Sequence, residues 1–342
     1  MAIIKTIGIR PIVMMARWNR YGIMPLVMES IIFLDRGTVI VSFRKPAVAH
    51  TWVDYERTVP EETVERLHGA TIAVTNKVKL HDAELSQLPE LKFIAITATG
   101  FDNVDLAFCR RRGIAVANVP GYARQSVPEH VMMLILALRR NLPAYEKAVR
   151  EGRWQSSPQP TVNDIPVEDL CGSTLGLIGY GDLAKGVERL ARAFGMEILI
   201  AEHKETGSVR PGRILFLEVL RRADVVSLHT PLTDQTRHLI GPTELALMKR
   251  SALLINAARG GLVDEQALAD ALRQGRLGGA GIDVLSTEPP RSGNPLLELK
   301  LPNLLVTPHI AWTSRQAQEL LAEEVVKNIE AYAAGKPRNI VS

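Results

Sequence analysis

The chain has 342 residues, of which 46% are hydrophobic, and this is enough for two domains that each bury a core. Its 41 Lys and Arg against 37 Asp and Glu give a formal net charge of +4, a small basic excess without the aromatic-interleaved basic stripe typical of nucleic-acid binding. Cys109 and Cys171 fit no metal-ligand spacing, so we expect no bound metal, no disulfide framework and a reducing, cytoplasmic location.

The first part of the chain differs from the rest. Residues 1–27 are apolar, but four basic residues interrupt them too often for a membrane-spanning helix, and they lack a clean small-residue cleavage site. A strand pattern begins only at residues 31–35. We therefore predict that residues 1–29 are an N-terminal extension with no role in the fold. A mitochondrial-type targeting segment is the alternative, because the segment is poor in acidic residues and contains Arg, although it is short of Ser.

Short apolar strands alternate with helical patterns from residue 31 to about residue 119. This alternation predicts a parallel sheet covered by helices on both faces. A long helix is expected to follow, with Ser126 as its N-cap, Pro128 in the first turn and Glu129 favourable to the helix dipole. Residues 131–138 are too apolar for a solvent-facing helix, so we expect them to be buried against the other domain or a second subunit.

Residues 174–202 have the pattern of a strand, a glycine-rich turn, an amphipathic helix and a second strand. Gly179 and Gly181 let the chain turn sharply and approach a pyrophosphate, which the N–H groups of the following helix can bind. Ala184 replaces the third glycine of the G-x-G-x-x-G pattern, a tolerated variant. Glu202 ends the second strand, where it can accept hydrogen bonds from an adenosine ribose. The segment predicts a dinucleotide-binding unit, and a phosphate-free strand–helix turn is the alternative.

Glu202 also bears on the choice of coenzyme. A carboxylate at this strand end would repel the 2′-phosphate of NADP, so the spacing favours NAD. His203 and Lys204 follow directly and could soften that discrimination.

Three ionisable residues follow strands of the second α/β series, which runs over residues 173–307. Arg259 follows the strand ALLINAA, Glu288 follows GIDVLST, and His309 follows NLLVTP. Ligands bind outside the carboxyl ends of parallel strands, so the three could converge beside a nicotinamide ring. Reduction of a 2-oxo acid needs a cation, a proton donor and an acid that keeps the donor protonated. Taken singly, the three could instead be a helix-end charge, a turn cap and a buried core histidine.

These motifs resemble those of the D-isomer-specific 2-hydroxyacid dehydrogenases over residues 30–341. The likeness lies in five segments: GYGDL after a strand, HTPLTDQT at 229–236, NAARGGLVDE at 256–265, GIDVLSTEPP at 281–290 and TPHIAW at 307–312. Within that family the chain is most similar to the glycerate dehydrogenases, also called hydroxypyruvate reductases. That finer likeness lies in TNKV at 75–78, ATGFDNVDL at 98–106 and SVPEHV at 126–131.

The resemblance implies a role for each candidate residue. Arg259 would bind the substrate carboxylate and carbonyl, His309 would be the general acid in reduction and the base in oxidation, and Glu288 would hydrogen-bond His309. The implied coenzyme-binding residues are Gly179, Tyr180, Gly181, Asp182 and Leu183 at the pyrophosphate, Glu202 at the ribose, His229, Pro231 and Thr236 on the adenosine side, Val127 and Ala257 at the nicotinamide pocket, and Asp283 at the nicotinamide carboxamide. The implied substrate-binding residues are Asn76, Lys77, Thr99, Gly100 and Trp312, together with Arg259 and His309.

The resemblance also implies two doubly wound α/β domains. A Rossmann coenzyme domain, residues 127–311, would be inserted in a discontinuous flavodoxin-like substrate domain, residues 30–126 and 312–342. The amphipathic helix at 319–335 would return to the first domain. We expect NAD as the cofactor, no metal, a small 2-oxo or 2-hydroxy acid as the substrate and a homodimer as the assembly. We expect no nucleic acid and no membrane among its partners.

The sequence therefore predicts an NAD-dependent oxidoreductase that reduces hydroxypyruvate or glyoxylate to a D-2-hydroxy acid. A D-3-phosphoglycerate dehydrogenase is the nearest alternative, although many of those enzymes carry an added regulatory domain. Formate dehydrogenases of the same fold lack a glutamate partner for the histidine, so Glu288 counts against them. A coenzyme-sensing corepressor would keep the fold as a binding module, and turnover of a 2-oxo acid would distinguish it. A plain sugar- or nucleotide-binding domain is the least favoured alternative.

Overall fold

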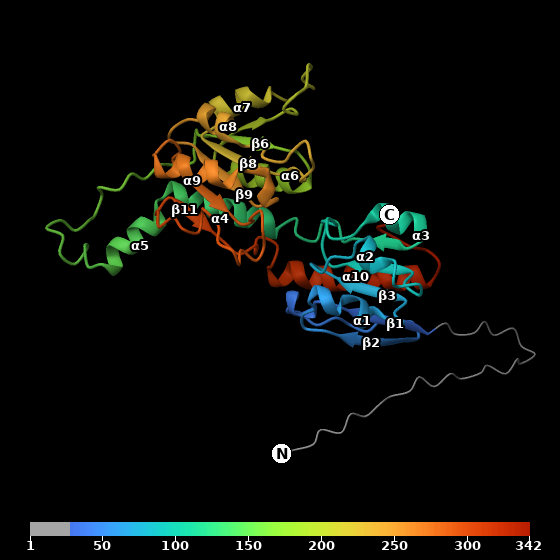
Figure 1. Ribbon diagram of the computed structural model, residues 1–342. Coiled ribbons are helices and arrows are strands. Elements are labelled where there is room, and N and C mark those ends of the chain that lie inside the picture. Colours follow the sequence, from blue (N-terminus) through green and yellow to red (C-terminus); the bar gives the residue numbers. More distant parts are fainter. Residues whose placement is uncertain (1–27) are drawn as a thin grey trace, which may run out of the picture. The chain divides into compact units, whose positions relative to one another are not determined.

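The computed structural model describes residues 28–342, so nearly all of the predicted N-terminal extension lies outside the described residues. The chain forms two compact units (Figure 1). Of the described residues, unit 1 contains 28–38, Arg44–Asn118 and Val325–Ser342, and unit 2 contains Val39–Phe43 and Val119–Glu324. The domain boundaries expected at 126/127 and 311/312 stay a prediction.

Unit 1 is built on a five-stranded parallel sheet. Its strands are β1 (Glu29–Phe33), β2 (His50–Asp54), β3 (Ile72–Thr75), β4 (Phe93–Ile96) and β5 (Ala115–Ala117). They lie in the order β2-β1-β3-β4-β5, which is the flavodoxin-like order. The helical elements are η1 (Arg36–Thr38), η2 (Pro60–Glu62), α1 (Thr63–Leu67), α2 (Asp82–Leu85) and α3 (Leu106–Arg112). Every residue of β3 and β4 is buried, as is typical of parallel strands covered on both faces.

Unit 2 is built on a six-stranded parallel sheet. Its strands are β6 (Thr174–Ile178), β7 (Glu197–Ile200), β8 (Val225–Leu228), β9 (Leu253–Asn256), β10 (Gly279–Ile282) and β11 (Leu304–Val306). They lie in the order β11-β10-β9-β8-β6-β7. A parallel bridge between Ala201 and Ile214 stands beyond β7 where a dinucleotide fold has its third strand. The strand order reverses between β6 and β8, and the predicted fold class is confirmed.

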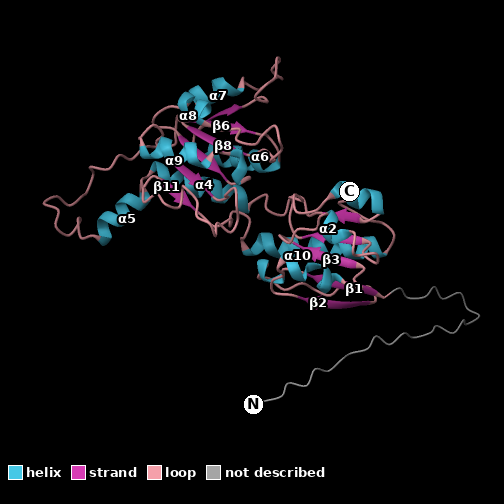
Figure 2. Cartoon of the chain, in the orientation of Figure 1, coloured by secondary structure: helices cyan, strands magenta, loops and turns pink. Residues whose placement is uncertain are grey.

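Helices surround the strands of each unit (Figure 2). Those of unit 2 are α4 (Ser126–Arg139), α5 (Leu142–Arg150), α6 (Asp182–Ala193), α7 (Phe216–Arg222), α8 (Pro242–Leu247), η3 (Gly260–Leu262) and α9 (Glu265–Arg273). The last helix, α10 (Arg315–Ala333), begins in unit 2 and ends in unit 1. Among residues 28–342, no helix is long and apolar enough to cross a membrane.

Two expectations for the long helix α4 are wrong. Ser126 is not its N-cap, because Gln125 takes that position and the Ser126 hydroxyl donates to the carbonyl oxygen of Ala311 (2.6 Å). The apolar side of α4 does not need another domain or subunit, since Val131 and Leu134 are fully buried in one core cluster with strand residues of unit 2 itself. Asn141, which has a left-handed φ of 47°, separates α4 from α5.

The C-terminal part of α10 belongs to unit 1. The ring of Tyr332 stacks on that of Phe93 with the centroids 4.4 Å apart, and the side-chain amide of Asn328 donates to the carbonyl oxygen of Asn118 (2.9 Å). Past the helix, Ile340 forms an antiparallel bridge with Ala117 of β5. The final residues are therefore part of the unit 1 sheet.

Candidate functional site

The glycine-rich turn lies between β6 and α6, at the point where the strand order reverses. Gly179 has a φ of 85°, and a Cβ there would lie 2.5 Å from the carbonyl oxygen of His229, which follows β8. Gly181 precedes α6, and a Cβ there would meet nothing within 4 Å. The fold itself therefore requires the first glycine. The second leaves open space at the N-terminus of α6, which suits the close approach of a pyrophosphate.

This difference predicts two different results for alanine at the two positions. Gly181→Ala should keep the melting temperature and weaken NADH binding by about tenfold or more, because the added methyl lies where the pyrophosphate would approach. Gly179→Ala should lower the melting temperature, because it combines a left-handed backbone with a clash against the His229 carbonyl. Thermal unfolding and titration of protein fluorescence with NADH measure both effects. NADH binding that is unchanged in Gly181→Ala would contradict the assignment of this turn.

The start of α6 packs tightly on α4. Ala184, which replaces the third glycine, is fully buried. A Cβ at Gly186 would lie 2.6 Å from the ring of Pro128 in α4. Asp182 pairs with Arg124, whose Nη2 lies 2.5 Å from the carboxylate, so one turn of α6 is tied to the segment before α4. No local pattern marks Arg124 as part of the site, because its partner lies 58 residues away.

The other predicted pyrophosphate residues follow the same turn. The Tyr180 hydroxyl donates to Glu188, and this hydrogen bond raises the pKa of the tyrosine. Tyr180 and Leu183 are partly buried and pack against the core cluster that includes α4. The turn and the first residues of α6 are therefore fixed by contacts within unit 2.

Glu202 lies at the expected strand end, but its carboxylate is already bound. Its side chain is 2% exposed, and the guanidinium of Arg210 reaches both carboxylate oxygens, with Nε 2.7 Å from Oε2. Hydrogen bonding to Arg210 holds the pKa of Glu202 far below its usual range. The sequence predicts a carboxylate open to ribose hydroxyls, whereas the structure shows one covered by an arginine eight residues further on.

The three predicted adenosine-side residues belong to one loop after β8. The backbone N–H of His229 donates to the carbonyl oxygen of Ile178 (2.7 Å), so the loop starts beside the glycine turn. The His229 ring lies 2.9 Å from the Ser227 hydroxyl, and burial lowers its pKa to about 4, which leaves the ring neutral near pH 7. The Thr236 hydroxyl donates to the carbonyl oxygen of Pro231 (2.7 Å) and closes the loop.

His309 and Glu288 form a pair at the carboxyl ends of neighbouring strands. His309 Nδ1 lies 2.6 Å from Glu288 Oε2, and the other carboxylate oxygen of Glu288 accepts from the backbone N–H of Leu285 (2.8 Å). The histidine side chain is 24% exposed and the glutamate side chain 34% exposed. Because the carboxylate accepts the Nδ1 proton, Nε2 is the ring nitrogen suited to exchange a proton with a substrate.

Arg259 follows β9, the strand next to β10 in the sheet. Its carbonyl oxygen accepts from the side chain of Asn256 (2.9 Å). A Cβ at the next residue, Gly260, would lie 1.9 Å from the carbonyl carbon of Leu285, so the loop of Arg259 touches the loop that leads to Glu288. The three catalytic candidates therefore come from the ends of three adjacent strands of one sheet.

An aromatic pair lies close to these residues. Tyr122 and Trp312 meet edge to face with their ring centroids 6.0 Å apart. Burial raises the pKa of the Tyr122 hydroxyl, and the positive charge of Arg259 opposes that rise. Val127 and Ala257 belong to the same apolar cluster. The roles predicted for Trp312, Val127 and Ala257 stay predictions. Tyr122 was not among the predicted residues, because it lies in a turn without a periodic pattern.

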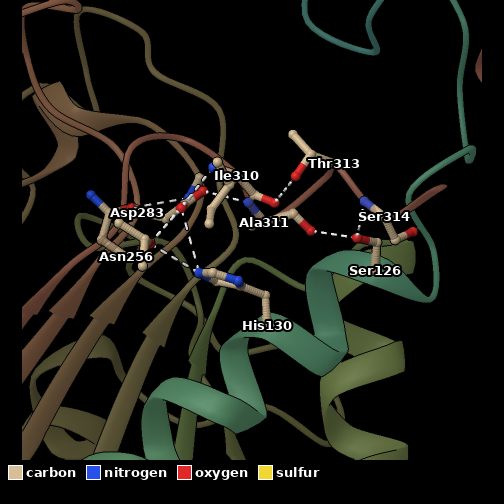
Figure 3. Close-up of polar contacts among 10 residues, drawn as sticks. Ser126, His130, Asn256, Asp283, Ile310, Ala311, Thr313 and Ser314 are labelled. Atoms are coloured by element: carbon tan, nitrogen blue, oxygen red, sulfur yellow. Dashed lines mark hydrogen bonds and ion pairs between the residues drawn. The ribbon is translucent and has the colours of Figure 1, made fainter. Parts of the chain in front are cut away.

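Asp283 anchors the backbone that follows His309 (Figure 3). Its carboxylate is 1% exposed and accepts from the backbone N–H of Ile310 and of Ala311 (both 2.9 Å) and from the Thr307 hydroxyl (2.6 Å). His130 of α4 completes the group, with Nε2 3.4 Å from the carboxylate. Contact of Asp283 with a nicotinamide carboxamide stays a prediction, and the structure adds a role in holding the His309 segment.

His130 and Ser126 both connect α4 to this segment, and no local sequence pattern marks either contact. His130 Nε2 lies 3.0 Å from the Thr307 hydroxyl, and burial lowers the pKa of the histidine. The Ser126 hydroxyl donates to the carbonyl oxygen of Ala311, as Figure 3 shows. The segment that carries His309 is thus tied to β10 on one side and to α4 on the other.

The remaining substrate candidates lie in unit 1. Asn76 and Lys77 follow β3, and their backbone N–H groups donate to the buried carboxylate of Asp35 at distances of 2.9 and 2.6 Å. Thr99 and Gly100 follow β4, and the Thr99 carbonyl oxygen accepts from the side chain of Asn118 (2.7 Å). The four candidates thus lie at the carboxyl edge of adjacent strands. Asp35, which fixes one of the two loops, was not among the residues that the sequence singled out.

Three kinds of comparison with known proteins identify the same family. Residues 132–311 match the family described as the D-isomer specific 2-hydroxyacid dehydrogenase, NAD binding domain. A glycerate dehydrogenase of Methylorubrum extorquens is 48% identical over 316 residues, which cover 92% of this chain and 99% of that protein. A hydroxypyruvate reductase of Blautia hydrogenotrophica is 34% identical over 82% of this chain and 88% of its own.

A solved structure is similar along most of the chain. The crystal structure of a D-lactate dehydrogenase from Aquifex aeolicus, complexed with NAD and lactic acid, matches with a TM-score of 0.75 and 29% identity. The match covers 90% of this chain and 96% of that protein. The likeness therefore extends over both compact units.

Proposed function

This chain belongs to the D-isomer-specific 2-hydroxyacid dehydrogenases, which are NAD-dependent oxidoreductases, and we propose that its substrates are hydroxypyruvate and glyoxylate. The main observation behind the proposal is the His309–Glu288 pair. Both residues follow strands of the sheet that also contains β6, the strand before the glycine turn. Reduction would give the D-2-hydroxy acid, which is D-glycerate from hydroxypyruvate. The names of the two relatives compared above, a glycerate dehydrogenase and a hydroxypyruvate reductase, support this choice.

Three side chains, those of His309, Glu288 and Arg259, have separate roles in the proposed reaction. The bound coenzyme supplies the hydride that converts the C2 carbonyl to an alcohol. His309 Nε2 donates a proton to the carbonyl oxygen, and Glu288 stabilises the imidazolium through Nδ1. The guanidinium of Arg259 binds the substrate carboxylate and polarises the carbonyl, because a planar fork of donors matches carboxylate oxygens.

The coenzyme fits the residues of unit 2. The space above Gly181 at the N-terminus of α6 would take the pyrophosphate. Tyr180, Asp182 and Leu183 would surround it, and the loop of His229, Pro231 and Thr236 would lie on the adenosine side. Val127, Ala257 and Asp283 would meet the nicotinamide.

The aromatic pair supports a small substrate. Trp312 lies three residues after His309 and is packed against Tyr122, so the rings limit the room for a side chain on C2. Glyoxylate has only hydrogen there and hydroxypyruvate has one CH₂OH group. Binding of the substrate carboxylate by Lys77, Thr99 and Gly100 is proposed from the family resemblance alone.

A panel of 2-oxo acids, followed by NADH oxidation, tests the proposal. The panel contains hydroxypyruvate, glyoxylate, pyruvate, 3-phosphohydroxypyruvate and phenylpyruvate. Hydroxypyruvate and glyoxylate should give the highest kcat/KM, and pyruvate should be slower, because one group in such a pocket is worth about 1–3 kcal/mol. Chiral analysis should identify D-glycerate.

Each alternative predicts a different result on the same panel. A preference for 3-phosphohydroxypyruvate would indicate a phosphoglycerate dehydrogenase. Binding of NADH without turnover of any acid would indicate a coenzyme-sensing binding module. Highest rates with phenylpyruvate, or an L-glycerate product, would refute the proposed substrate class.

We also propose a homodimer in the cytoplasm. Helix α5 and the loop after it extend away from the rest of unit 2 (Figure 1). They expose large apolar side chains, with Leu142 59% exposed and Trp154 54% exposed, and such a surface suits an interface between subunits. Light scattering that gives the mass of a single chain would contradict the dimer.

A further inference from the structure

The strand end that should meet the adenosine ribose presents an arginine. Four donors reach the two oxygens of Glu202: the backbone N–H of His203 (2.9 Å), the backbone N–H of Arg210 (3.2 Å), Arg210 Nε (2.7 Å) and Arg210 Nη2. The Glu202 side chain is 2% exposed and that of Arg210 is 54% exposed. The outward-facing group at this position is therefore a guanidinium and not a carboxylate.

Two further cations lie near Arg210 at this strand end. Arg213 Nη1 lies 4.0 Å from the Glu202 carboxylate. Lys204 Nζ lies 3.0 Å from Glu244, whose side chain is 8% exposed. Both nearby buried acids are thus paired with cations, and Glu205 is the exposed acid in the loop after the strand. Three cations and three acids lie at this strand end, but two of the acids are buried, so the exposed charge here is mainly positive.

The position of Glu202 and Arg210 in the fold determines which part of a coenzyme would lie beside them. Glu202 lies two residues after β7, directly after the bridge between Ala201 and Ile214, and β7 is the strand next to β6 and its glycine turn. In a dinucleotide fold the adenosine ribose lies at this strand end, and its 2′ oxygen points toward the residue that ends the strand. A 2′-phosphate would therefore extend toward Arg210.

We propose that Arg210 makes this strand end a binding site for the 2′-phosphate of NADPH, so that the enzyme uses NADPH as a second coenzyme. The inference rests on the coenzyme-binding function proposed for unit 2. An uncovered Glu202 would repel the phosphate. Arg210 covers it with Nε and Nη2, and the other edge of the guanidinium, formed by Nη1 and the second N–H of Nη2, can donate to phosphate oxygens. When NADH binds, its ribose hydroxyls must compete with Arg210 for hydrogen bonds to the Glu202 carboxylate. This competition weakens the preference for NADH over NADPH that a carboxylate alone would give.

Binding measurements on three variants test the inference. Arg210→Gln removes the charge at similar size, and Arg210→Lys keeps the charge. Arg221→Gln serves as the matched control, because Arg221 of α7 is also 52% exposed and pairs with a glutamate, but lies at the other end of the sheet from the glycine turn. NADH and NADPH are titrated by fluorescence, and 5′-AMP and adenosine 2′,5′-bisphosphate by calorimetry, so the result does not depend on turnover.

Wild type should bind NADPH within about tenfold of NADH. Arg210→Gln should weaken NADPH and the bisphosphate by about tenfold or more and leave NADH and 5′-AMP unchanged or tighter. Arg210→Lys should recover part of the loss, and Arg221→Gln should match wild type.

Two outcomes would overturn the inference. One is an equal loss of both coenzymes in Arg210→Gln, which would make Arg210 a purely structural partner of Glu202. The other is a preference of wild type for NADH of about a thousandfold or more that does not change in Arg210→Gln. Failure of the substrate panel with intact binding of both coenzymes would count against the proposed reaction and not against this site.

Discussion

Replacing His309 by Asn is expected to lower kcat for hydroxypyruvate reduction by about 10²–10⁴-fold and to leave the Kd for NADH nearly unchanged. The amide cannot donate a proton as an imidazolium does, and His309 is the residue whose Nε2 is suited to do so. Asn suits the position because His309 has a φ of 55°, a left-handed backbone that Asn tolerates better than most residues. Single-turnover rates and NADH titration separate the two effects.

Glu288→Gln is the companion variant for this prediction. The amide keeps the shape of the glutamate but removes the negative charge beside Nδ1, so the imidazolium of His309 is stabilised less. Since reduction needs the protonated ring, kcat of the variant should fall by about tenfold or more while the Kd for NADH stays nearly unchanged. A His309→Asn enzyme with nearly full activity, or an unchanged kcat in Glu288→Gln, would require a different proton donor.

Replacing Asp283 by Ala is expected to lower the free energy of unfolding by about 3–5 kcal/mol and to reduce kcat as well. The change leaves three donors without the buried carboxylate that accepts from them: the N–H groups of Ile310 and Ala311 and the Thr307 hydroxyl. These groups hold the segment that begins with His309. Loss of the anchor should therefore affect the position of the proton donor and not only the stability of unit 2.

Asp264→Ala provides the matched control. Asp264 caps α9 by accepting one hydrogen bond from the backbone N–H of Ala267 (3.0 Å), and loss of such a cap costs about 1 kcal/mol. Urea unfolding and steady-state kinetics of both variants give the comparison. Equal destabilisation in the two variants, or a normal kcat in Asp283→Ala, would show that Asp283 does not organise the His309 segment.

Elements with a regular local pattern could be predicted from the sequence. The segment 174–202 folds into β6, α6 and β7 with Gly179 and Gly181 in the turn, because alternating and helical periods can be recognised within a few residues. The ends of the strands before Arg259, Glu288 and His309 were predicted in the same way. The pairing of His309 with Glu288 came from the family resemblance, and the 2.6 Å contact agrees with it.

Contacts between distant residues could not be predicted. Ser126 reads locally as a helix cap, but its hydroxyl bonds to Ala311, 185 positions away. Asp35 and Asn76 are 41 positions apart, and no local pattern marks the buried carboxylate that holds the loop after β3. Arg210 lies in an irregular loop, so its contact with Glu202 depends on how that loop folds back on the strand.

The contact at Gly260 limits how this enzyme can be redesigned for other acids. A single added methyl there would overlap the backbone of Leu285. The loop that contains Arg259 and the loop that leads to Glu288 therefore restrict each other's backbone conformation. A mutant library that randomises residue 260 would consist mostly of misfolded or inactive members. Diversity is better introduced at Tyr122 and Trp312, whose contact joins two side chains and not two backbones.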